Sequence, residues 1–238
     1  MRGLGTLCNV LAVLAGGGLG LLLKSGLSER FQKILMQACA LAVLFIGASG
    51  AMAGLLAVNG GSLGTQGSTL MVLSLVFGGL MGEALNIELR MEKLGSAIRA
   101  RFGAGEDAGF VNGFVTASLV ICVGAMAVVG SIQDGLTGDW SMLLAKSMLD
   151  FIIVMVFAST MGAGVLLSAL PLGIYQGGIT LLAGFIAPWL TDALISNLSF
   201  IGSVLIFAVG VNLLRPGTFR VGNLLPALLV PAAWELII

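Results

Sequence analysis

The sequence predicts an all-α polytopic membrane protein, and three observations support this fold class. Of the 238 residues, 58% are hydrophobic and only 9% are charged, and the mean hydropathy is +1.10. Apolar stretches of about 20 residues, the length that crosses a ~30 Å hydrocarbon core, recur along the chain. Lys and Arg collect in alternate connections between these stretches. We therefore expect one membrane domain over residues 1–238, with the lipid bilayer as its main partner.

Eight apolar segments are long enough to cross a bilayer, and the approximate limits below define them. They are 3–23, 33–57, 68–87, 109–131, 142–161, 164–187, 196–214 and 220–237. The first is longer than the roughly 7–15 residue core of a cleaved signal, so we expect it to be retained. Gly162-Ala163-Gly164 and Pro171 mark two alternative divisions between the fifth and sixth segments. Ser28-Glu29 and Thr191-Asp192 are typical helix starts.

The basic residues predict the orientation of these segments. With eight crossings, Arg2 and Lys146 fall on one side of the membrane, and the other nine of the 11 Lys and Arg residues fall on the opposite side. The nine are Lys24, Arg30, Lys33, Arg90, Lys93, Arg99, Arg101, Arg215 and Arg220. Positive residues favour the cytoplasmic side, so both termini are expected outside the cytoplasm.

Residues 86–108 form the only sizeable polar segment. Their apolar members, Ile87, Met91, Leu94 and Ile98, repeat at helical spacing, and charged residues occupy most of the positions between them. This pattern predicts a cytoplasmic amphipathic helix over 88–108 that lies on lipid headgroups or binds a protein partner.

The two ends of the chain match each other weakly. Leu27-Ser28-Glu29, followed by Gly47, aligns without a gap with Leu190-Thr191-Asp192, followed by Gly210. Two further features correspond approximately. Gly16-Gly17 corresponds to Gly177-Gly178, and Glu83 to Glu235, which extends the match to the third and eighth segments. The match predicts an internal repeat.

The predicted repeat is inverted. Helices 1–3 and 6–8 start five crossings apart, an odd number, so equivalent helices would cross the membrane in opposite directions. The first repeat would cover residues 1–87 and the second 162–238, with 109–161 as connecting helices. Inverted repeats characterise many transporters, whose sites lie where interrupted helices meet.

Two ionisable residues lie inside the fifth segment. Lys146 and Asp150 are four residues apart, so they share one helix face. Ionisable groups within a membrane usually mark a functional site, although a mutually neutralising pair would also explain them. Glu83 and Glu235 are either further proton carriers or carboxylates that reach interfacial water. The predicted ion-coupling set is therefore Asp150, Lys146, Glu83 and Glu235.

Polar groups also surround the glycine pair of the sixth segment. Where Gly177-Gly178 loosens the helix, backbone groups could turn toward a cavity, and the Gly16 cluster could do the same in the first segment. The alternative is that the glycines only admit a neighbouring helix. The predicted substrate-binding set is Asn9, Gly16, Gly17, Gly18, Tyr175, Gln176, Gly177, Gly178 and Thr180.

Several classes of function lack support in the sequence. The net charge is zero, which gives no sign of a nucleic-acid partner. The chain has no histidine, and its three cysteines, Cys8, Cys39 and Cys122, lie in different apolar segments. No hydrolase, kinase or metal motif is present. We expect neither an enzyme, nor a metal site, nor a cofactor.

Long stretches resemble one family of bacterial inner-membrane proteins. The stretches are "GFVTASLVICVGAMAVVGSIQDGLTGD" (113–139), "AKSMLDFIIVMVFASTMGAGVLLSALPL" (145–172) and "YQGGITLLA" (175–183), together with "GGLMGEALNIE" (78–88) and "NLLPALL" (223–229). Over nearly its whole length the chain resembles the YqgA/YdfK-type family, which is named for a domain of unknown function. The resemblance implies a polytopic protein of the inner membrane with a role in transport.

The leading hypothesis is a transporter of a small polar solute or an ion. The same polar residues would suit a passive channel, which can be a homo-oligomer. A third hypothesis is a membrane scaffold that docks a cytoplasmic partner through residues 86–108.

Overall fold

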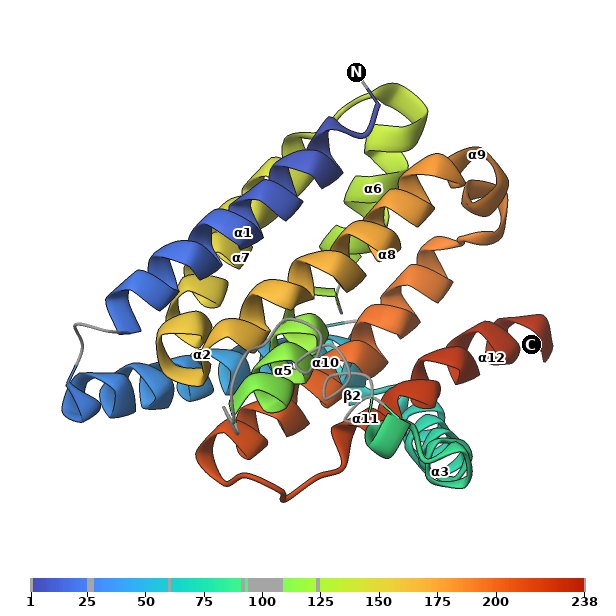
Figure 1. The fold of residues 1–238 in the computed structure, drawn as a ribbon. Coiled ribbons are helices and arrows are strands. Elements are labelled where there is room, and N and C mark those ends of the chain that lie inside the picture. Colours follow the sequence, from blue (N-terminus) through green and yellow to red (C-terminus); the bar gives the residue numbers. More distant parts are fainter. Residues whose placement is uncertain are drawn as a thin grey trace. The chain divides into compact units, whose positions relative to one another are not determined.

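A computed structural model describes residues 2–24, 28–59, 61–90, 93, 109–122 and 125–237, and its fold is shown in Figure 1. The longer helices are α1 (Leu4–Lys24), α2 (Glu29–Leu55), α3 (Ser68–Leu85), α5 (Gly109–Cys122), α6 (Ala125–Thr137), α7 (Ser141–Met161), α8 (Ala169–Leu181) and α10 (Asp192–Leu214). The shorter ones are η1 (Ala163–Ser168), α9 (Ala183–Ile186), η2 (Ala187–Trp189), α11 (Val221–Leu224), η3 (Leu225–Leu229) and α12 (Val230–Ile237). The predicted helical membrane fold is confirmed.

The number of crossings differs from the expected eight when helices are counted by length and apolar character. Among the described residues, six helices qualify, and the count is seven if α5 and α6, bent by 61°, form one span. The segment expected at 220–237 is divided among α11, η3 and α12, so it does not count as one long helix. The count of eight therefore stays a prediction.

The break between α7 and η1 follows from glycine. Gly162 ends α7 with φ of 93°, a conformation that side chains other than hydrogen disfavour. Pro171 lies in the first turn of α8, where a missing N–H costs little. Of the two candidate boundaries, the glycine cluster is the one that divides these helices.

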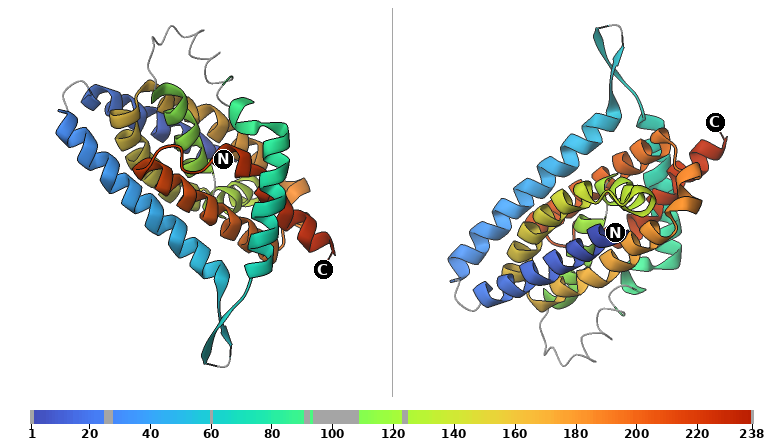
Figure 2. Two further views of the ribbon diagram at one scale, coloured as in Figure 1. Left: turned by 90° about the horizontal axis from the view of Figure 1, so that it is seen from below. Right: turned by 90° about the horizontal axis from the view of Figure 1, so that it is seen from above.

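One short hairpin interrupts the helical chain. Strands β1 (Leu56–Asn59) and β2 (Ser62–Thr65) pair antiparallel and project beyond the end of α2 (Figure 2).

The predicted start of α10 is confirmed, because the Thr191 side chain accepts the N–H of Leu194 at 3.0 Å. The predicted amphipathic helix at 88–108 lies almost entirely outside the described residues.

The chain divides into two compact units that interleave in sequence. Unit 1 comprises Met1–Cys39 and Glu92–Leu190, and unit 2 comprises Ala40–Met91 and Thr191–Ile238. Each unit thus draws helices from both expected repeats rather than coinciding with one of them. The repeat itself stays a prediction.

In unit 1, α1 packs directly on the backbone of α7 (Figure 1). A Cβ placed on Gly16 would clash with the carbonyl oxygen of Phe151, and one placed on Gly20 would clash with that of Met155. A Cβ placed on Gly5 would meet the Leu143 side chain, so contacts advance together along both helices and the helices run parallel. Small residues permit this close approach.

Helix α8 contacts α1 in the opposite direction. Thr6 lies against Thr180, Asn9 against Gln176, and Val10 near Gly173. Because residue numbers rise on α1 as they fall on α8, the two helices are antiparallel. Unit 1 therefore places α1 between two helices of opposite direction.

In unit 2, the glycines of α2 and α10 make reciprocal contacts. A Cβ on Gly47 would clash with the backbone of Phe207, and a Cβ on Gly210 would meet Leu44, including its backbone nitrogen at 2.9 Å. Phe207 stands three residues before Gly210, just as Leu44 stands three residues before Gly47. The two glycines that match in sequence therefore make equivalent contacts.

The other half of unit 2 packs α3 against the chain that follows α10. Gly78 of α3 lies against Ala227, and Gly82 lies against Asn223, so α3 is antiparallel to the segment of α11 and η3. The hydrophobic core of this half of unit 2 contains Leu70, Phe200, Ile201 and Ala227. Figure 2 shows α3 alongside this last part of the chain.

The close packing of α1 on α7 yields a matched pair of tests. Gly20→Ala places a methyl group against the carbonyl of Met155, so we expect a loss of about 1–3 kcal/mol in stability. Gly18→Ala adds the same group where no atom lies within 4 Å, so its thermal unfolding temperature should equal or exceed that of the wild type. Equal unfolding temperatures for the two variants would contradict this packing.

Candidate functional site

A buried ion pair lies at the centre of unit 1. Lys146 Nζ is 2.6 Å from Asp150 Oδ2, and the two side chains are 9% and 5% exposed. They stand four residues apart on α7, which places them on one face as the spacing predicts. An unpaired charge inside an apolar bundle costs several kcal/mol, so each residue offsets part of the free-energy cost of burying the other.

Asn9 connects this ion pair to helix α8. Its Nδ2 group donates to Asp150 Oδ2 at 2.9 Å and to Gln176 Oε1 at 3.3 Å. Asn9 comes from α1, Asp150 from α7 and Gln176 from α8, and both amide residues are fully buried. Four sequence-predicted residues, from three separate segments, are thus brought together.

A threonine pair extends the same interface toward the start of α1. The hydroxyl oxygens of Thr6 and Thr180 lie 3.4 Å apart, and both residues are buried. Thr6 is three residues before Asn9, and Thr180 is four residues after Gln176, so each pair shares a helix face. Thr180 was predicted, whereas Thr6 was missed, although its spacing to Asn9 was the available signal.

The hydrogen-bonding rules fix the orientation of both amides. A carboxylate only accepts hydrogen bonds, so Asn9 must turn its NH₂ group toward Asp150. The same NH₂ group faces Gln176, which must therefore present its oxygen. This arrangement leaves Asn9 Oδ1 and Gln176 Nε2 buried without a hydrogen-bond partner among the described residues. Each such group costs about 1–3 kcal/mol.

The expected openings of the backbone at the glycine clusters are not found. Helix α1 continues through Gly16, Gly17 and Gly18, and α8 continues through Gly177 and Gly178. Gly16 packs against backbone and Gly17 against the Leu166 side chain, which is the packing role considered as the alternative.

Tyr175 also lies apart from the polar cluster. Its side chain is 38% exposed, whereas Gln176, the next residue on α8, is fully buried. Successive helix residues point about 100° apart, so both cannot face the cluster equally. A role for Tyr175 in binding stays a prediction.

A second buried carboxylate, Asp134, escaped the sequence analysis. It belongs to α6, is fully buried and accepts the backbone N–H groups of Gly3 and Gly5 at 3.1 and 3.0 Å. The first N–H groups of a helix lack internal partners, so Asp134 satisfies the start of α1. It lay just beyond the expected limit of a span, where an aspartate is ordinary.

The two remaining predicted residues belong to unit 2. Glu83 binds Arg220 at 2.8 Å and accepts a hydrogen bond from Asn223 Nδ2 at 2.6 Å. Glu235 accepts the Thr191 hydroxyl at 2.6 and 2.8 Å. Both carboxylates therefore tie helix ends together in unit 2, and their predicted role in proton coupling is untested.

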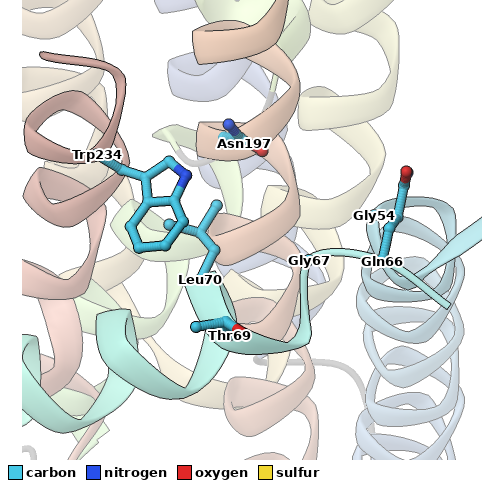
Figure 3. A pocket seen from close by; sticks show the side chains of 7 residues that line it. All are labelled: Gly54, Gln66, Gly67, Thr69, Leu70, Asn197 and Trp234. Atoms are coloured by element: carbon cyan, nitrogen blue, oxygen red, sulfur yellow. The ribbon is translucent and has the colours of Figure 1, made fainter. Parts of the chain in front are cut away.

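Unit 2 also contains a cavity of about 370 Å³ (Figure 3). Its lining consists of Gly54, Gln66, Gly67, Thr69, Leu70, Asn197 and Trp234. In Figure 3 the indole ring of Trp234 lies beside Leu70, below Asn197. No ionisable side chain is part of this lining, which distinguishes it from the charged cluster of unit 1.

Apolar helices that hold an ion pair and two amides in their interior define a polytopic membrane protein with a buried polar site. Comparison of the sequence then gives the family. The chain belongs to the family described as "Protein of unknown function (DUF554)", whose model matches residues 4–236.

Two relatives cover nearly the whole chain. The uncharacterised membrane protein YdfK of Bacillus subtilis is 33% identical over 227 residues, which are 95% of this chain and 93% of YdfK. The uncharacterised protein YqgA of Escherichia coli is 33% identical over 239 residues, or 97% of each chain. The resemblance inferred from the sequence is thereby confirmed. No solved structure matches the chain significantly.

The ion pair predicts a non-additive effect on stability. Lys146→Met or Asp150→Leu alone leaves one buried charge unpaired, and we expect each to cost about 3–5 kcal/mol. The double variant removes both charges, so it should be more stable than either single variant. Thermal unfolding of the purified proteins measures the cycle, and additive losses would contradict a mutually stabilising pair.

Proposed function

We propose that this protein transports a small polar solute or an ion across the membrane and that it is not an enzyme. The single observation that carries the proposal is the buried pair of Lys146 and Asp150, joined through Asn9 to Gln176. Charged and amide groups are expensive in a membrane interior, and they typically mark the path of a substrate or an ion. Their convergence from three helices supports a site rather than a local structural contact.

Each polar residue has a distinct role in this proposal. Asn9, Gln176 and Thr180 contact the transported species, because they line the interface between α1 and α8. Asp150 couples transport to a proton or a cation, and Lys146 controls its charge state through the ion pair. The glycine clusters allow the helices to approach or separate, rather than providing backbone ligands.

Two features favour a transporter over a passive channel. Asn9 and Gln176 are fully buried, which suits a site that opens alternately to the two sides. The reciprocal contacts of Gly47 and Gly210 are those that a local two-fold axis between α2 and α10 would produce. Such axes relate inverted repeats in many transporters.

The direction of packed helices supports the proposed topology. Parallel packing of α1 and α7 requires an odd number of crossings between them, which α2, α3 and the α5–α6 pair would supply. A crossing by α11, η3 and α12, antiparallel to α3, would bring the total to eight. The proposed location is the bacterial inner membrane, with both termini outside the cytoplasm.

Fusion of a reporter to each terminus tests this topology. Alkaline phosphatase is active only outside the cytoplasm, so both fusions should be active in a bacterial host. A fusion after Arg215, between α10 and α11, provides the matched control and should be inactive. Activity at only one terminus would contradict eight crossings.

Transport itself can be tested without knowledge of the substrate. Proteoliposomes are incubated with a mixture of amino acids, sugars, nucleosides, organic acids and inorganic salts under an imposed proton gradient. Mass spectrometry then identifies their contents. We expect at least one component to accumulate above empty vesicles and Asp150→Asn to abolish the accumulation, because the coupling carboxylate is lost.

Asp139→Asn is the matched control for this experiment. Asp139 is exposed just before α7, and the N–H of Ser141 donates to it and lowers its pKa, so it is charged at neutral pH. Its replacement removes a charge of the same type outside the site and should leave uptake unchanged. If no component separates wild-type from empty vesicles, transport is excluded for the classes of compound in the mixture.

A further inference from the structure

We propose that the site in unit 1 takes a small solute of zero net charge that carries a hydrogen-bond donor beside an acceptor, as amides and alcohols do. This inference rests on the proposed transport function. That proposal allowed either a small polar solute or an ion, and the inference selects the solute. It follows from two unpartnered atoms, the charge balance of the cluster and the loose packing of one helix.

The two atoms that lack a hydrogen-bond partner within the described part of the chain are complementary in type. Asn9 Oδ1 accepts hydrogen bonds and Gln176 Nε2 donates them, and both belong to fully buried side chains. Their directions are imposed by Asp150, which compels Asn9 to donate and thereby compels Gln176 to accept from it. A ligand that satisfies both must donate to one and accept from the other.

The charge balance argues against a monatomic ion. Lys146 and Asp150 form a pair of zero net charge. A cation would satisfy Asn9 Oδ1 but would meet the N–H groups of Gln176, and an anion would meet the opposite mismatch. Either ion would also add an uncompensated charge to an apolar bundle. A net-neutral molecule with both kinds of polar group avoids both penalties.

The packing around α1 shows where such a molecule can enter. Against α7, Gly16 and Gly20 bring α1 into contact with backbone carbonyls. Against α8, a Cβ on Gly173 would come within 3.2 Å of the Val10 side chain and one on Gly177 within 3.9 Å of the Thr6 side chain, and neither would meet a backbone atom within 4 Å. Helix α8 therefore packs on α1 through side chains and less closely than α7 does, so it can separate from α1 with a smaller loss of close packing.

The polar contacts across this looser interface are also long. Asn9 Nδ2 and Gln176 Oε1 are 3.3 Å apart, and the two threonine hydroxyls are 3.4 Å apart. Distances near the upper limit of hydrogen bonding indicate weak bonds. The solute would replace the bond between Asn9 and Gln176 as α8 separates, while the shorter bond from Asn9 to Asp150 stays in place.

The test compares two sets of labelled probes in proteoliposomes. Radiolabelled urea, acetamide, glycerol and glycine represent net-neutral solutes, and radiolabelled sodium, rubidium and chloride represent ions. We expect uptake of at least one neutral solute, and no ion uptake above that of empty vesicles when no neutral solute is present. Gln176→Met and Asn9→Leu keep the volume of each side chain and should each lower this uptake about tenfold.

Ser168→Ala is the matched control, because Ser168 is fully buried but bonds locally to the carbonyl of Val165 at 2.6 Å. Its uptake should equal that of the wild type. Size-exclusion elution and thermal unfolding of each variant establish that it is folded before uptake is compared.

The outcomes separate this inference from the broader proposal. Uptake of an ion alone, sensitive to Asp150→Asn, would overturn the neutral solute and leave transport standing. Neutral uptake that both folded amide variants retain would show that the unpartnered atoms do not bind the solute. Absence of uptake for every probe overturns the inference. The experiment with the mixture of amino acids, sugars, nucleosides, organic acids and salts then decides whether the transport proposal is also wrong.

Discussion

The buried bond between Lys146 and Asp150 is the constraint on which the arrangement of unit 1 depends. A lysine and an aspartate in an apolar bundle are stable only if they pair with each other and their remaining donors and acceptors form hydrogen bonds. Asn9 supplies one further hydrogen bond to Asp150, and it reaches that position because glycines let α1 approach the α7 backbone. Gln176 then completes the chain of polar contacts from α8.

Unit 1 therefore combines one tight helix pair with one looser neighbour. Helices α1 and α7 meet through glycine and backbone atoms, and the shortest polar contacts lie between or within them. The polar contacts from α1 to α8 are longer, at 3.3 and 3.4 Å. Separation of α8 from α1 would expose Asn9 and Gln176 while Lys146 and Asp150 stay paired, as the proposed transport would require.

Composition and segment length were sufficient to predict the helical membrane fold, because backbone N–H and C=O groups in lipid must pair with each other and a helix of about 20 residues satisfies them within one segment. The i, i+4 spacing predicted the ion pair, and the isolated amides Asn9 and Gln176 indicated a site. The contacts between them were not predictable, since they depend on which glycines face another helix. Gly16 and Gly177 look alike in sequence, yet Gly16 packs against the backbone of Phe151, whereas Gly177 faces only the side chain of Thr6. Asp134 was missed because its partners are backbone groups, which leave no pattern in the side-chain sequence.

Density between Asn9 and Gln176 is the most direct measurement of the central claim. Cryo-electron microscopy of the protein in a lipid nanodisc, enlarged by a bound antibody fragment and saturated with the solute found in vesicles, would resolve this interface. The account predicts density for that solute within hydrogen-bonding distance of both Asn9 Oδ1 and Gln176 Nε2. An unchanged direct contact between the two side chains, with the solute bound elsewhere or absent, would contradict it.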